Sequence, residues 1–153
     1  MRNKQAGAPN SEVPSGSPHS PNKITADLQV AIPHRNPELT RAALRYVSSL
    51  ANGLDLRLRL IDVHVVPYGV PLDEPTVNPK HLERCLKSLA QECPAQVSAE
   101  IVYARDWELG LRRALGPGSV VLIPIKRSWW RTSEKRLAAK LRRLGHQVIW
   151  VDC

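Results

Sequence analysis

The strict alternation of strand-like and helix-like segments is the feature that most constrains how this chain can fold. Five short runs of aliphatic residues are separated by four segments with helical hydrophobic periodicity. Strands that alternate with helices form parallel sheets, because each connection carries a helix across one face of the sheet. We therefore predict a single-domain α/β fold with a five-stranded parallel sheet, doubly wound and Rossmann-like. The predicted strands are Asp27–Ile32, Leu54–Val65, Gln96–Tyr103, Ser119–Ile125 and Gln147–Asp152.

Local signals place the ends of the predicted elements. The pairs Asn36-Pro37 and Asn78-Pro79 each offer a capping side chain followed by a proline at the first helical position. Asp106 can cap a short third helix, and Gly145 ends a fourth. Pro33 is expected to close the first strand. The buried face of the fourth helix is predicted to carry Leu137, Leu141 and Leu144.

The spacing of apolar residues along the sequence sets two of the predicted strands apart. In the second strand, leucines alternate with polar residues up to Leu60, and the apolar positions then change phase at Ile61. This slip suggests a β-bulge. The fourth strand, SVVLIPI, is continuously apolar, as expected for a strand buried on both faces.

Residues 1–23 differ in composition from the rest of the chain. They contain four prolines among serine, asparagine and glycine, with almost no apolar residues, so we predict a disordered tail before a domain at residues 24–153. The tail lacks the apolar core of a secretory signal, and no run in the chain is long enough to span a membrane. The three cysteines lack Cys-x-x-Cys spacing, which argues against a disulfide framework or zinc site and favours a cytoplasmic location.

Positive charge is concentrated in the last third of the sequence. Residues 24–104 carry 8 basic and 9 acidic side chains, whereas residues 105–153 carry 11 basic and 4 acidic. A basic surface can attract nucleic acid, anionic metabolites or acidic lipid. A solvated, arginine-rich helix face would explain the same composition.

The order of these segments resembles the universal stress protein family over roughly residues 25–153. The resemblance rests on a first strand followed by proline and a capped helix, and on a second strand ending in His64-Val65-Val66. It continues through EIVYARDWELGLRRAL, SVVLIPI and QVIWVD, which are similar to the later strands and the short helix of the family. The resemblance implies strand order 3-2-1-4-5, with a ligand site where the order reverses between strands one and four.

The residues that bind ATP in members of this family are missing here. ATP-binding members have an aspartate after strand one and the motif G-x-x-G-x9-G-[ST] after strand four. In this chain the first exit is Pro33-His34-Arg35-Asn36, and no glycine follows the fourth strand before Gly145. Backbone without glycine cannot form the same phosphate cradle. We therefore expect no bound cofactor. We also expect no metal, because neither the cysteines nor the acidic residues have the spacing of a metal site.

Two loops are expected to meet at the switch point between strands one and four. Their basic side chains, with the amides at the start of the last helix, can form an anion site, or they can extend into water and bind nothing. Trp129-Trp130 can stack on a base or cover the crevice that ATP fills in other members. The candidate ligand residues are Pro33, His34, Arg35, Val63, Lys126, Arg127, Ser128, Arg131 and Thr132.

The last strand is a candidate dimer interface. Val148, Ile149, Trp150 and Val151 are contiguous and apolar, with no proline or lysine to protect a sheet edge. The resemblance implies pairing through this strand. Alternatively, Trp150 packs inward and the end of the chain shields the edge.

Sequence signals for catalysis are weak. His64 lies within a strand pattern, and Asp62 has no carboxylate partner at a catalytic or metal-binding spacing. We predict a non-catalytic, universal stress protein-like module that dimerises and senses an anionic ligand. The alternatives are a basic nucleic-acid-binding module that uses the last helix and Trp129-Trp130, and a partner-docking domain related to the stress-protein-like domains of transporters.

Overall fold

The predicted five-stranded parallel sheet is present, in the order β3-β2-β1-β4-β5. The computed structural model describes residues 28–50, 56–75, 77–126 and 133–152, so the predicted tail at residues 1–23 lies outside the described residues. The elements are β1 (Leu28–His34), α1 (Pro37–Leu50), β2 (Leu56–Val65), α2 (Pro79–Gln91), β3 (Gln96–Ala104), α3 (Trp107–Ala114), β4 (Val120–Ile125), α4 (Ser133–Arg143) and β5 (Gln147–Asp152). Within the described ranges, no helix combines the length and hydropathy required to cross a bilayer.

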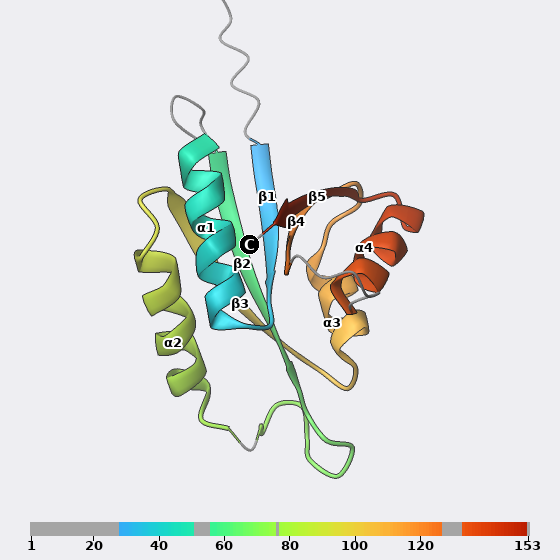
Figure 1. Cartoon of the computed structure of the whole chain (residues 1–153). Coiled ribbons are helices and arrows are strands. Elements are labelled where there is room, and N and C mark those ends of the chain that lie inside the picture. Colours follow the sequence, from blue (N-terminus) through green and yellow to red (C-terminus); the bar gives the residue numbers. More distant parts are fainter. Residues whose placement is uncertain (1–27, 51–55, 76, 127–132, 153) are drawn as a thin grey trace, which may run out of the picture.

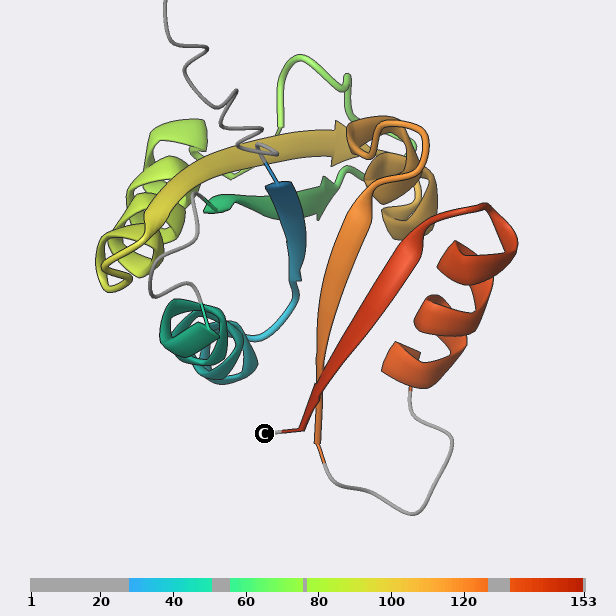
Figure 2. The ribbon, with the colours of Figure 1, turned by 90° about the horizontal axis from the view of Figure 1, so that it is seen from above.

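The helices cover the sheet in two pairs (Figures 1 and 2). α1 and α2 lie on one side, and α3 and α4 lie on the other. Each pair closes its own hydrophobic core, so the central strands are buried on both faces. On β1, for example, Ile32 packs toward α1 and Ala31 packs toward α3 and α4.

The predicted capping residues are confirmed. The Asn36 side-chain oxygen accepts from the backbone amides of Glu38 and Leu39, at 2.8 and 3.3 Å. Asn78 and Asp106 accept amide hydrogens in the same way at the starts of α2 and α3. Because these bonds satisfy amides that a helix cannot pair internally, the turns after β1 and β3 are fixed in place.

Three sequence-based expectations about individual strands and helices were wrong. β1 does not end at Pro33 but continues to His34. Proline has no amide hydrogen to donate, but the pairing of β1 with β4 is unaffected because it ends at Ala31. β2 keeps an unbroken register with both neighbours, so its change of phase at Ile61 reflects burial on both faces rather than a bulge. Leu144 is 42% exposed, because α4 ends before it at Arg143.

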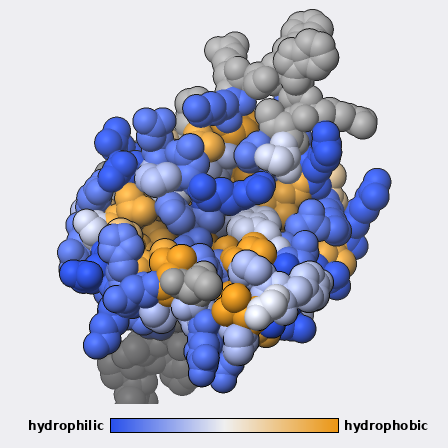
Figure 3. Space-filling model, turned by 90° about the horizontal axis from the view of Figure 1, so that it is seen from below, coloured by the Kyte–Doolittle hydropathy of each residue, from blue (hydrophilic) through white to orange (hydrophobic). Residues whose placement is uncertain are grey.

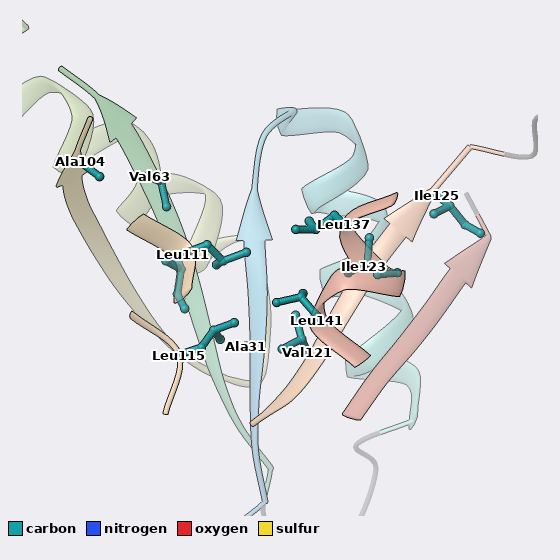
Figure 4. Packing of buried hydrophobic residues seen from close by; sticks show 12 residues of the cluster. Ala31, Val63, Ala104, Leu111, Leu115, Val121, Ile123, Ile125, Leu137 and Leu141 are labelled. Carbon is teal, nitrogen blue, oxygen red and sulfur yellow. The ribbon is translucent and has the colours of Figure 1, made fainter. Parts of the chain in front are cut away.

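α3 lies unusually close to the sheet at Gly110. A Cβ atom at this position would lie 2.5 Å from Cγ1 of Val63 and 2.8 Å from Cβ of Ala104. Val63 and Ala104 belong to the same buried cluster as Leu111 of α3, and this cluster also contains Leu137 and Leu141 of α4 with Val121 and Ile123 of β4 (Figure 4). This close packing fixes the start of α3, and with it Trp107, beside the end of β1.

Candidate functional site at the switch point

The strand order reverses at β1, which lies between β2 and β4 in an all-parallel sheet. The carboxyl ends of β1 and β4 therefore lead into α1 and α4 on opposite faces of the sheet, as expected from the strand order. In open parallel sheets this divergence leaves a crevice in which ligands bind. The fold thus contains the predicted switch point between β1 and β4, while residues 127–132 of the loop after β4 lie outside the described residues.

The described residues form a small pocket at this crevice. Its volume is about 40 Å³, and both β1 and β4 contribute to it. Drug-sized ligands generally occupy pockets of about 300–1,000 Å³. The space formed by these residues is closer in size to a water molecule or a small inorganic anion. The lining residues are Pro33, Arg35, Asn36, Leu39, Thr40, Ile123, Pro124, Glu134 and Leu137.

Two charged side chains among the described residues line this pocket, Arg35 after β1 and Glu134 in the first turn of α4. The Arg35 guanidinium lies 4.6 Å from the centre of the Trp107 ring, a cation–π contact that holds it near the end of β1. The hydroxyl of Ser133 donates to a carboxylate oxygen of Glu134 at 3.0 Å. An arriving anion would therefore meet a positioned cation and a competing carboxylate.

His34 belongs to a polar cluster on the α1 side of the sheet. Its Nδ1 lies 2.9 Å from the hydroxyl of Thr40, which is 1% exposed. Asp62 is the register partner of His34 on β2. Burial lowers the pKa of His34, and the nearby Asp62 carboxylate partly opposes this effect.

The pKa of the Asp62 carboxyl is shifted in the opposite direction. Burial raises the pKa of Asp62, while His34 and His64 partly offset that change. His64 also packs edge-on against Tyr103, with ring centres 5.8 Å apart. The His34 ring is thus positioned by its hydrogen bond with Thr40 and by the charge of Asp62 on the neighbouring strand.

The remaining predicted ligand residues occupy different places. Lys126 is exposed directly after β4 and does not line the pocket. Val63 lies in the core beneath α3, 5% exposed, and does not line the pocket either. Arg127, Ser128, Arg131 and Thr132 lie outside the described residues, as does Trp129-Trp130.

Sequence reasoning missed three residues at this site: Asp62, Trp107 and Glu134. Asp62 was dismissed for lack of a carboxylate partner, although a parallel register places β1 and β2 residues side by side. Trp107 follows the Asp106 cap, and Glu134 opens α4, so both stand at helix starts that face the carboxyl ends of the strands. Their place at the start of a helix was the sequence signal that could have identified both residues. Across the described residues, no group of three or more metal-ligating side chains comes together.

β5 forms one edge of the sheet, as predicted. The amide of Gln147 donates to the carbonyl oxygen of Ser119, on the β4 side. Because successive strand residues point their amides in opposite directions, the amide and carbonyl of Val148 face the free edge. Arg142 donates a hydrogen bond to that carbonyl at 3.2 Å, and its guanidinium lies 5.0 Å from the centre of the Trp150 ring.

The side chains of the predicted interface differ in exposure. Ile149 is 41% exposed on the α1 side, whereas Val151 is 3% exposed and belongs to the core on that side. Val148 and Trp150 are half-buried and pack against the core beneath α4. The edge of β5 thus offers backbone groups and Ile149 rather than four exposed apolar side chains.

Comparison with known proteins agrees with this architecture. The structure is similar to that of a protein from the universal stress protein family from Burkholderia pseudomallei, with a TM-score of 0.50 and 17% sequence identity. The likeness covers 80% of this chain and 94% of that one. The chain has a universal stress protein-like fold. No protein-family model and no curated protein matches the sequence.

Proposed function

We propose that this chain is a non-catalytic, universal stress protein-like module that binds a small anion at the switch point and dimerises through β5. The observation that carries the ligand part is the pocket between β1 and β4, with Arg35 held on its wall by Trp107. A guanidinium in a fixed position offers paired donors to an oxyanion, at little further cost in side-chain entropy.

The size of the pocket supports a small anion over a nucleotide. About 40 Å³ accommodates a phosphate or sulfate group far better than an adenine ring with its ribose and phosphates. The absence of the family's glycine motif from the sequence points the same way. The ligand class we propose is therefore an inorganic oxyanion, or the phosphate or carboxylate end of a larger metabolite.

A pair of opposite substitutions tests this ligand site. Millimolar phosphate should raise the melting temperature of the parent protein, and Arg35→Gln should remove most of that rise because the cation is lost. Glu134→Gln should increase it, since the competing carboxylate becomes neutral. Arg45→Gln, an exposed arginine on α1, serves as the control and should respond like the parent. An equal response in all four proteins would mean that phosphate acts elsewhere.

The dimer part of the proposal is supported by the free edge of β5. An unpaired row of amides and carbonyls is a template for a second strand, and two copies can pair antiparallel about a two-fold axis. In the single chain Arg142 occupies one carbonyl of this edge, at Val148. Dimerisation would exchange this hydrogen bond for those between the two strands.

Val148→Pro tests the dimer with little damage to the sheet. The substitution removes an amide that faces the free edge and leaves the pairing with β4 intact, a position where proline is tolerated in edge strands. Light scattering at about a hundred micromolar should give a dimer for the parent and a monomer for the variant, with matching circular dichroism. A parent that stays monomeric at this concentration refutes the dimer.

A further inference from the structure

The outer surface of α4 carries a dense set of basic side chains. Five of its eleven residues are lysine or arginine, and only Glu134 is acidic. Its buried residues, Leu137, Ala138 and Leu141, face the core shared with α3 and β4. Because the apolar stripe is used by the core, the basic residues lie on the remaining surface of the helix.

A shallow groove of about 450 Å³ follows this surface. Its lining residues in the described part of the chain come from α4: Lys135, Arg136, Ala139, Lys140 and Arg143. They recur every three or four positions, so they share one helical face. The small side chain of Ala139 lies between longer basic side chains in sequence, which accounts for the depression. We call these five residues the outer face of α4.

The cations of the outer face differ in their existing contacts. Lys140 forms an ion pair with Glu108 of α3. Arg142, which does not line the groove, is engaged with β5. Arg136 and Arg143 are exposed and have no ion-pair partner among the described residues. They are seven positions apart, so their backbones stand about 10 Å apart along the helix.

These features select a class of ligand. Arginine forks match phosphate oxygens, and two of them spaced along one helix suit a ligand with repeated phosphates. A membrane-binding helix would need an apolar face to enter the lipid, but the leucines of α4 are buried in the core. We propose that the outer face of α4 binds the phosphodiester backbone of nucleic acid. This surface is separate from the pocket at Arg35 and does not depend on the proposed anion site.

Binding through phosphates alone has a measurable signature. The affinity should be largely independent of base sequence and should fall steeply with salt, because each neutralised phosphate releases counterions. The probe is a fluorescein-labelled oligonucleotide of random sequence, single-stranded and duplex, titrated in fluorescence anisotropy with the full chain. Loss of one phosphate contact reduces the slope of log affinity against log salt by about 1.

Two double variants with the same loss of charge separate the contribution of the outer face of α4 from that of net charge. Arg136→Gln with Arg143→Gln should lower the affinity at low salt by at least about tenfold and reduce the salt slope by about 2. Arg45→Gln with Arg84→Gln removes the same charge from α1 and α2, on the other side of the sheet, and should leave both quantities nearly unchanged.

Three results would overturn the proposal. The first is equal weakening by the two double variants, which would mean that binding follows net charge rather than the outer face. The second is absence of binding by the parent at low salt. The third is tighter binding of the parent to phosphatidylserine vesicles than to either oligonucleotide, which would assign the face to a lipid surface.

Discussion

Replacing Gly110 with alanine should destabilise the protein, although this glycine lies inside a helix. A glycine-to-alanine change in a helix interior normally stabilises by about 0.5–1 kcal/mol, because alanine loses less backbone entropy. Here the new Cβ would lie 2.5 Å from Cγ1 of Val63 and 2.8 Å from Cβ of Ala104. Neither atom can move away easily, since both belong to buried strand residues.

The size of the effect follows from these two opposing terms. Overpacking in a closed core costs about 1–3 kcal/mol. Because both contacts are shorter than 3.0 Å, we take the upper part of this range, about 2–3 kcal/mol. After the gain in helix propensity is subtracted, Gly110→Ala should lower the free energy of unfolding by about 1–2.5 kcal/mol. In a chain of this size that corresponds to a melting temperature lower by about 2–10 °C. Urea denaturation and thermal melts followed by circular dichroism both measure it.

A second substitution tests the cause of this loss. Val63→Ala removes the nearer contact, so the double variant should lose at least about 0.5 kcal/mol less than the sum of the single variants. Gly69→Ala, where a Cβ would meet nothing within 4 Å, is the control. A Gly110→Ala protein as stable as the parent would show that α3 does not pack this closely on the sheet.

Other predictions follow from the tail, the polar cluster and the sheet edge. Deleting residues 1–23 should change the free energy of unfolding by no more than about 0.5 kcal/mol, measured by urea denaturation; a larger loss would mean that the tail docks. Because the folded state lowers the pKa of His34, the unfolded state binds more protons just below pH 6.5, and the stability from this group should fall with acidification there. Asp62 acts with the opposite sign: its raised pKa gives stability that is lost as pH rises above about 3.8. Asp62→Asn should lower the pKa of His34 further in an NMR titration, whereas an unchanged pKa would mean that the two groups do not interact. Arg142→Gln should lower the dimer dissociation constant by freeing the Val148 carbonyl; a weaker dimer would show that Arg142 supports the interface.

The fold could be predicted because its signals are local and repeated. The caps at Asn36, Asn78 and Asp106 each satisfy helix amides through residues next to them in sequence, so the sequence alone locates them. The phase change in β2 was harder to interpret. Apolar residues at every second position indicate a strand with one buried face. In a strand buried on both faces, apolar residues occur at odd and even positions alike, as they do in β2.

The site was predicted less well because it depends on long-range packing. The sequence placed Arg35 at the correct strand exit, but the pocket also needs Glu134, about a hundred residues later in the chain. The contact of Arg35 with Trp107 depends on how closely α3 approaches the sheet at Gly110. Val63 was among the expected ligand residues, but it fills the space beneath α3.

The most direct test of the proposed function compares phosphate and magnesium-ATP by calorimetry on the same preparation. The small pocket and the positioned Arg35 predict that phosphate binds at millimolar concentration, and that Arg35→Gln abolishes the binding heat. The same reasoning predicts that ATP shows no tight, magnesium-dependent binding. A micromolar dissociation constant for magnesium-ATP would contradict the account, because it would require a nucleotide site in a chain that lacks both the aspartate and the glycine motif of ATP-binding family members.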